Sequence, residues 1–174
     1  MKKLFKLLVF TLLLAACSPK YFMQGTVSNN FDKSKTYNVA IMPPVIKGVG
    51  ETANLQDKCY GKLKAELMNV KNLNIKGDLT SIKKAIKNNQ IGASDYVDHD
   101  LYKKAAESVG CEAYVFTEIT RESDKLPVLA QVEIFDVQSG NTLYVGRGRG
   151  QNPLTVEAEA ELAIELALKS LLEK

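Results

Sequence analysis

Histidine, cysteine and tryptophan are scarce in this sequence. It has one histidine, His99, three cysteines and no tryptophan. Zinc-type metal sites draw on several histidines and cysteines, and histidine is the most frequent general acid or base. The composition therefore favours a protein that is not an enzyme and that holds neither a metal ion nor a cofactor.

A basic surplus is also lacking once the N-terminus is set aside. The chain has 23 lysines and arginines against 20 aspartates and glutamates, and Lys2, Lys3 and Lys6 account for the whole difference. Domains that bind nucleic acid carry a basic patch because they neutralise phosphates. We therefore expect no nucleic-acid partner.

Long apolar runs are absent except near the start of the chain. Residues 7–16 are apolar apart from Thr11, and they follow a basic segment over residues 1–6. A bilayer span needs about 20 apolar residues, whereas this shorter run is typical of a signal peptide. We predict that residues 1–16 are a cleaved signal peptide.

The end of that segment, Leu14-Ala15-Ala16-Cys17, resembles the lipobox of bacterial lipoproteins. The resemblance implies that Cys17 becomes the first mature residue and carries a diacylglyceryl thioether and an amide-linked acyl chain. Several such chains make a lasting membrane anchor, because each buried methylene contributes about 0.8 kcal/mol. Ser18 resembles the pattern of lipoproteins sorted to the outer membrane. The alternative is a plain secreted protein with a free N-terminal cysteine.

The segment after the cysteine has the composition of a linker. Residues 18–35 mix serine, asparagine, glycine, lysine and proline without apolar periodicity. We predict a lipid-anchored flexible tether over residues 17–35 and a single globular domain over residues 36–174. Fully extended, the tether would reach at most about 60 Å, so the domain would stay near its membrane.

The predicted domain alternates between period-two and helical apolar patterns. In chain order these patterns predict β-α-β-α-α-β-β-β-α, an α/β fold whose mixed sheet has helices on both faces. Connections through a helix favour parallel neighbours, and the turn over residues 136–141 favours an antiparallel hairpin. The predicted strands are residues 37–42, 73–75, 111–120, 128–134 and 142–150. Three predicted helices begin after caps at Asn54, Asp78 and Asp98, and a fourth covers residues 154–172.

Three segments resemble a known group of bacterial proteins. They are YNVAIMPP from Tyr37, KKAAESVGCEAYVFTEIT from Lys103 and LAQVEIFDVQSGNTLYVGRG from Leu129. They are similar to the opening strand, the third strand and the last hairpin of periplasmic lipoproteins of the CsgG, LpoB and TolB N-terminal-domain group. The resemblance implies the fold more strongly than any activity, and it implies a non-enzymatic interaction or assembly role.

Two short motifs match catalytic or metal-binding patterns superficially. Ser81 and Lys84 have the S-x-x-K spacing of penicillin-binding enzymes, but the S-D-N and K-T-G companion motifs are missing. The run Asp98-His99-Asp100 places adjacent side chains in different directions, whereas metal-binding helices space their ligands at i and i+4. We expect Ser81 to lie on a capped helix, Asp98 to be an N-cap and Asp100 to lie near the helix dipole.

Residues 146–150 read Gly-Arg-Gly-Arg-Gly and lie in a predicted strand rather than in a phosphate-binding turn. Alternation then gives one bare glycine face, expected beneath a helix, and one face that carries Val145, Arg147 and Arg149. Arginine is enriched at protein interfaces and binds carboxylates bidentately. We predict Arg147 and Arg149 as partner-binding residues.

Cys59 and Cys111 are the two cysteines of the predicted domain, and in an oxidising compartment two cysteines can form a disulfide. Cys59 is predicted early in the first helix, and Cys111 begins a strand at the opposite edge of the sheet. A disulfide needs Cα atoms within about 7 Å, so we expect two buried free thiols.

These observations predict a non-enzymatic, lipid-anchored interaction or assembly module of the bacterial cell envelope, on the periplasmic face of the outer membrane. Its partner would be another envelope protein or further copies of itself. The alternatives are a ring-forming subunit of an export or surface-organelle assembly and, from another class, a peptidoglycan hydrolase. A hydrolase needs a nucleophile and base or carboxylates in a cleft, and no motif here indicates one.

Overall fold

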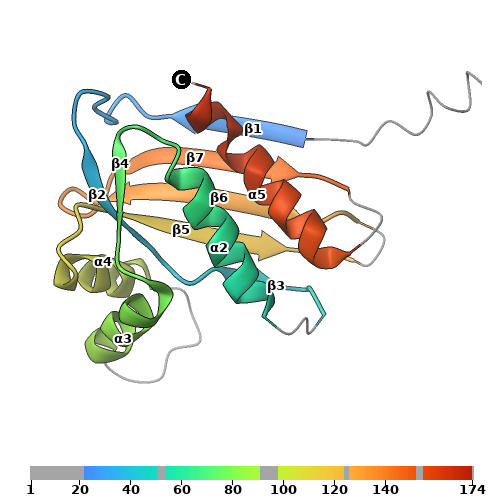
Figure 1. Cartoon of the computed structure of the whole chain (residues 1–174), viewed down its shortest axis with the longest axis horizontal. Helices are drawn as coiled ribbons and strands as arrows, with labels where there is room; N and C mark the ends of the chain where they lie inside the picture. Colours follow the sequence, from blue (N-terminus) through green and yellow to red (C-terminus); the bar gives the residue numbers. More distant parts are fainter. Residues whose placement is uncertain (1–21, 51–53, 91–97, 124–125, 152–154, 174) are drawn as a thin grey trace, which may run out of the picture.

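Seven strands form one mixed sheet in the order β1-β7-β6-β5-β2-β4, and β3 pairs with β5 beyond the end of β2 (Figure 1). The computed structural model describes residues 22–50, 54–90, 98–123, 126–151 and 155–173. The strands are β1 (Phe22–Val27), β2 (Tyr37–Ile41), β3 (Val45–Lys47), β4 (Leu73–Lys76), β5 (Ala113–Thr120), β6 (Leu129–Asp136) and β7 (Thr142–Arg149). The helices are α2 (Leu55–Leu67), α3 (Leu79–Asn89), α4 (His99–Ser108) and α5 (Val156–Leu172).

Helices lie on both faces of the sheet but cover them unequally. Helices α2 and α5 lie side by side on one face, where the larger apolar cluster joins them to the inward side chains of all the long strands. Helices α3 and α4 lie on the other face, over β2 and β5, and His99 of α4 also packs against Phe135 near the end of β6. Among the described residues, this second apolar cluster includes none from β7, β1 or the rest of β6, so the face is open there.

The predicted α/β architecture is confirmed. All nine predicted elements are present in the predicted order. Strand β2 lies between β4 and β5 and is parallel to both, whereas β5, β6 and β7 are antiparallel neighbours. The turn between β6 and β7 is closed by Asp136, which accepts hydrogen bonds from Ser139, and by Gly140 at φ 71°.

The predicted tether over residues 17–35 is wrong for the part that the structure describes. Phe22–Val27 form β1, an edge strand antiparallel to β7, and the side chain of Phe31 is buried against Tyr37 with ring centroids 5.3 Å apart. Only one side of β1 has a partner strand, and most of its residues are exposed. Its sequence therefore lacks the alternation of apolar and polar residues that indicates a strand. The domain thus includes residues from 22 on.

Strand β3 lies outside the predicted elements. Its three residues follow Pro43-Pro44 and continue beside β5, and the strand ends just before Gly48, whose φ is 66°. A three-residue strand has no readable period, so its pairing depends on the neighbouring β5.

The predicted helix ends are mostly confirmed. Asp78 caps α3 and exchanges hydrogen bonds with Ser81, Asp98 caps α4, and Gly110 has the left-handed φ of 73° expected after a helix. The prediction for Asn54 is wrong, because its side chain makes no cap hydrogen bond. Its φ is 68°, a left-handed conformation that asparagine tolerates.

The glycine face of β7 lies directly beneath α5, as predicted. A Cβ on Gly146 would lie 2.0 Å from the carbonyl oxygen of Ala167, and one on Gly148 would lie 2.1 Å from that of Ala163. The buried Tyr144 hydroxyl donates to the same Ala167 carbonyl. Glycine at these positions therefore sets how closely the helix approaches the sheet.

One charged residue of α5 is buried. A glutamate on a surface helix is usually exposed to solvent, yet the side chain of Glu159 is buried and lies 3.4 Å from the guanidinium of Arg121. Arg121 follows β5 and reaches across to the start of the helix. A partner distant in sequence therefore overrides the local helical pattern.

Candidate interaction surfaces

The open sheet face is the outward side of β1, β7 and β6. The strand register aligns Gln24, Arg147 and Gln131 in one row and Thr26, Val145 and Glu133 in the next. A small hollow of about 80 Å³ lies between the β1 and β7 members of these rows. The face is therefore polar and nearly flat, which suits a protein surface better than a small molecule.

Hydrogen bonds link the side chains of this face. Arg147 donates from Nε to Oε1 of Gln131 over 2.8 Å, and Gln131 donates from Nε2 to Oε1 of Glu133 over 2.5 Å. Further across the sheet, Lys47 pairs with Glu118 over 2.8 Å. Positive and negative groups thus alternate, so a partner with the complementary pattern would fit.

The structure brings both predicted arginines to this open face, in different environments. Arg147 is exposed, whereas Arg149 is half-buried at the end of β7, opposite Phe22. The Nε of Arg149 is buried and has no hydrogen-bond partner among the described residues.

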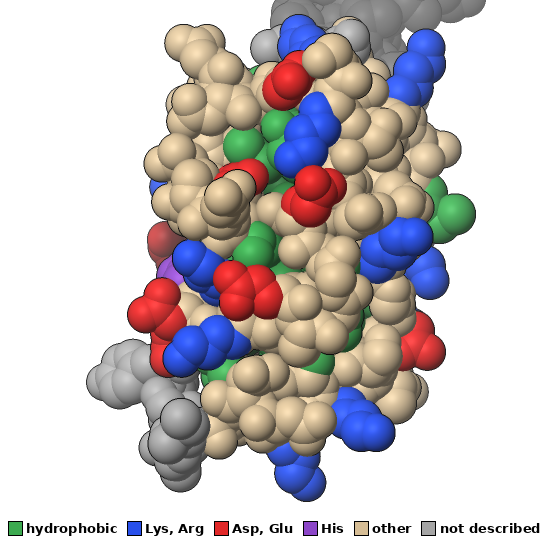
Figure 2. Space-filling model, turned by 90° about the vertical axis from the view of Figure 1, so that its left-hand side faces the viewer, with side chains coloured by type: hydrophobic (Ala, Val, Ile, Leu, Met, Phe, Trp, Pro, Cys, Tyr) green, Lys and Arg blue, Asp and Glu red, His purple; other side chains and the backbone are tan. Residues whose placement is uncertain are grey.

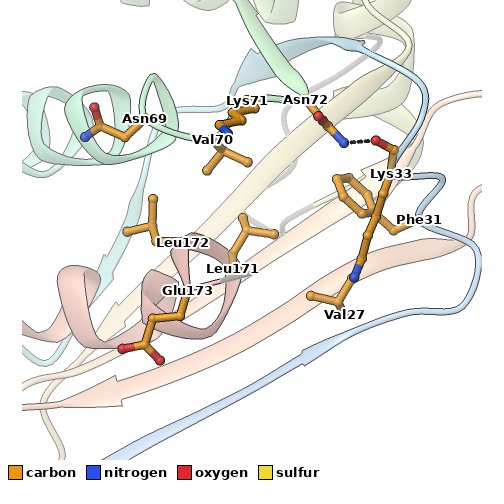
Figure 3. Close-up of a pocket in the computed structure, with 10 residues that line it drawn as sticks. All are labelled: Val27, Phe31, Lys33, Asn69, Val70, Lys71, Asn72, Leu171, Leu172 and Glu173. Carbon is orange, nitrogen blue, oxygen red and sulfur yellow. Dashed lines mark hydrogen bonds between the residues drawn. The ribbon is translucent and has the colours of Figure 1, made fainter.

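A pocket that the sequence did not predict lies at the other end of the sheet (Figure 3). Its volume is about 400 Å³. Three distant segments assemble it: the end of β1 with the turn after it, the turn between α2 and β4, and the end of α5. Its lining residues are Val27, Phe31, Lys33, Asn69, Val70, Lys71, Asn72, Leu171, Leu172 and Glu173.

Apolar and charged side chains together line this pocket. Apolar side chains such as Phe31 and Leu171 line it, two lysines and Glu173 lie around them, and Asn72 donates a hydrogen bond to the carbonyl of Lys33. Figure 2 shows the same end of the molecule, where charges of both signs alternate and apolar side chains show only between them. The pocket suits an apolar side chain of a partner.

The serine of the S-x-x-K motif belongs to the capping box of α3. Ser81 Oγ accepts from the backbone N–H of Asp78, and the Asp78 carboxylate accepts from the backbone N–H of Ser81 over 2.7 Å. Hydrogen bonds from the backbone N–H and the side chain of Ser81 hold the pKa of the Asp78 carboxyl below its usual value. Ser81 is therefore occupied as a structural residue.

The acidic pair around His99 serves the start of α4. Asp98 accepts from the backbone N–H groups of Asp100 and Leu101, as the cap prediction requires. The ring of His99 packs near Phe116 and Phe135, with centroids 5.2 and 4.9 Å away. Within the described ranges, no three histidine, cysteine or acidic side chains gather in a way that could hold a metal ion.

The two described cysteines are free and buried, as predicted. Cys59 lies in the core beneath α2, and Cys111 lies in the cluster on the opposite face of the sheet. Burial raises the pKa of both thiols to about 11, so neither is a reactive nucleophile at neutral pH.

The lipidation prediction falls on Cys17, which lies outside the described residues, as does the predicted signal peptide. Among the helices that the structure describes, none combines the length and the apolarity that crossing a membrane requires. The prediction for Cys17 therefore continues to depend on the sequence.

The fold is similar to that of several solved bacterial proteins. The C-terminal domain of LpoB from Salmonella enterica is 14% identical with a TM-score of 0.54, over 70% of this chain and 87% of that one. Lipoprotein GNA1162 from Neisseria meningitidis is 14% identical with a TM-score of 0.50, over 68% and 83%. The chain thus has an LpoB-like fold, as the resemblance implied. The CsgG and TolB parts of that resemblance stay predictions.

A third solved structure matches more of the chain. The PelC dodecamer from Paraburkholderia phytofirmans is 13% identical with a TM-score of 0.50, over 88% of this chain and 98% of that one. No family model matches the sequence, and no curated protein is similar to it in sequence. At these identities the comparisons establish the fold of the chain: an LpoB-like mixed sheet with helices on both faces.

Proposed function

We propose that the protein is a non-enzymatic, lipid-anchored interaction module of the bacterial envelope, held through Cys17 on the periplasmic face of the outer membrane. It binds another envelope protein through the open sheet face, where Arg147 is exposed and Arg149 lies at the edge of the face. The observation that carries the proposal is the combination of a lipobox-like Leu14-to-Cys17 segment with a fold shared by LpoB and a neisserial lipoprotein.

The geometry of the domain supports binding rather than catalysis. Ser81 belongs to the capping box of α3, Asp98 caps α4, and the thiols of Cys59 and Cys111 are buried. The open face, in contrast, offers a hydrogen-bonded polar row that includes the exposed Arg147. Such groups contribute to specificity when a complementary surface covers them.

Crosslinking in intact cells tests the binding role. A photoreactive residue at Gln24, in the same row as Arg147, should capture one main envelope protein identifiable by mass spectrometry. A photoreactive residue at Lys84, exposed on α3, is the matched control. Identical capture patterns from both positions would contradict the proposed face, and hydrolysis of purified peptidoglycan by the protein would contradict the non-enzymatic role.

A ring-forming subunit is the second candidate, because the PelC structure that matches 88% of the chain is a dodecamer. Further copies of this chain would then occupy the interaction surfaces. Mass measurement of the detergent-solubilised protein separates the two roles. A single subunit mass supports the accessory module, and a multiple of it supports the ring.

A further inference from the structure

Exposed apolar side chains gather at one end of the sheet. Four large hydrophobic side chains of the described chain are exposed: Phe22 by 47%, Met23 by 43%, Leu126 by 38% and Met68 by 65%. The first two begin β1, and Leu126 lies just before β6 starts at Leu129. Met68 follows α2 at the opposite end of the sheet.

The strand register places Phe22 beside one arginine, and Leu126 lies three residues before the other neighbour of that arginine. Phe22 lies opposite Arg149, and Arg149 lies opposite Leu129 on its other side. Phe22 faces the open side of the sheet, and Met23 faces the side of α5. We call Phe22, Met23, Leu126 and Arg149 the proximal end of the domain.

The length of the chain between Cys17 and Phe22 limits how far the proximal end can lie from Cys17. Five residues lead from Cys17 to Phe22, and such a segment spans at most about 18 Å when extended. If Cys17 is anchored as proposed above, on which this inference rests, β1 begins within that distance of the lipid. The pocket around Phe31 lies at the far end of the same strand.

The proximal end also has suitable chemistry for a lipid surface. Aromatic and other apolar side chains are stable at the boundary between headgroups and acyl chains. Arg149 is half-buried, so part of its side chain reaches solvent, and a guanidinium binds phosphate bidentately. Apolar side chains beside a cation match a phospholipid surface, in which phosphate headgroups lie above acyl chains.

We propose that the proximal end rests on the phospholipid surface. Phe22, Met23 and Leu126 enter the boundary region, and Arg149 binds a headgroup phosphate. The sheet then stands away from the membrane, so that the pocket points into the periplasm and the open face stays accessible to a partner.

Single-tryptophan variants test this contact, since the chain has no tryptophan of its own. The chain from Cys17 on is coupled through the Cys17 thiol to a maleimide phospholipid in vesicles of phosphatidylethanolamine and phosphatidylglycerol. Cys59 and Cys111 are buried, so the coupling is selective. Because the anchor is synthetic, the result is independent of whether cells acylate Cys17, which palmitate labelling decides separately.

Phe22→Trp and Leu126→Trp should each lose about half of their fluorescence when the vesicles contain lipids brominated in the acyl chains. Met68→Trp is the matched control and should keep its emission. Quenching of Phe22→Trp no greater than that of Met68→Trp would overturn the proposal.

Arg149→Gln tests the phosphate contact. In a chain whose anchor is removed by Cys17→Ser, this change should weaken binding to the same vesicles about fivefold. Lys71→Gln, at the far end of the sheet, should change it less than about twofold. Equal effects of the two variants would overturn the role of Arg149.

Discussion

The two faces of the sheet differ in what covers β7. On one face, Gly146 and Gly148 let α5 approach until its carbonyl groups lie against the strand. On the other face, the described helices α3 and α4 pack in a cluster that includes no residue of β7, so Arg147 and Arg149 lie outside their cover. Within residues 146–149, the two glycines therefore determine packing on the covered face, and the two arginines are available for recognition on the open face. Substitutions on the covered face should change stability, and those on the open face should change binding.

The largest effect is expected from Gly148→Ala on the covered face. Its Cβ would lie 2.1 Å from the Ala163 carbonyl oxygen, a backbone atom that moves only if α5 moves. We expect the free energy of unfolding in urea to fall by about 3 kcal/mol.

Gly61→Ala is the control for that change, because nothing lies within 4 Å of its Cβ position on α2. It should raise the free energy of unfolding by about 0.5 to 1 kcal/mol, since alanine favours a helix over glycine. A Gly148→Ala protein as stable as the Gly61→Ala protein would contradict the close packing of α5 on β7.

The next effect concerns ion pairs on the two faces. Arg121→Met leaves the buried Glu159 carboxylate without its cation on the covered face, and we expect a loss of about 2 to 3 kcal/mol. Lys47→Met removes the exposed partner of Glu118 on the open face and should cost less than about 1 kcal/mol.

Chemical unfolding of both variants measures this difference. The double variant Arg121→Met with Glu159→Leu should recover part of the loss, because it removes the uncompensated charge. Equal losses for Arg121→Met and Lys47→Met would show that burial does not distinguish the two pairs.

A smaller, pH-dependent effect is expected at Glu112, before β5. Hydrogen bonds from Lys35 and from the Asn38 backbone N–H hold the pKa of this carboxyl below its ordinary value of 4.5. The stabilisation is therefore present above pH 4.5 and is lost as the pH falls through the lowered pKa of the folded state.

Glu112→Gln should accordingly reduce stability at pH 7 by less than about 1 kcal/mol, because the pair is exposed. The gap to the unaltered protein should close in acid. Unfolding curves at both pH values measure it, and a gap of the same size in acid would assign the effect to packing instead.

The smallest effect on stability is expected from Arg147→Glu on the open face. The side chain is exposed, so the free energy of unfolding should stay within about 0.5 kcal/mol of the original value. The same change should abolish recovery of the partner in a pulldown from envelope extracts. Lys84→Glu on α3 is the matched charge reversal, and unchanged recovery with Arg147→Glu would remove this arginine from the interface.

The sequence predicted elements whose signals are local. The period-two pattern of β6, the cap at Asp78 and the left-handed Gly110 each depend on a few neighbouring residues. The face on which Arg147 lies could be predicted in the same way, because alternation along a strand is independent of the rest of the fold.

What the sequence missed depends on distant partners. Strand β1 is ordered by β7, more than a hundred residues later, and Glu159 is buried because Arg121 reaches it from another element. The pocket needs three separate segments to meet at one end of the sheet. No local period carries such information, so these features follow only from the assembled fold.

The central claim is that Cys17 fixes this domain to a membrane. The most direct measurement is the intact mass of the protein purified from cells grown with labelled palmitate. The account predicts a chain that begins at Cys17, carries the label and needs detergent to stay in solution. An unlabelled chain that is soluble without detergent would contradict it.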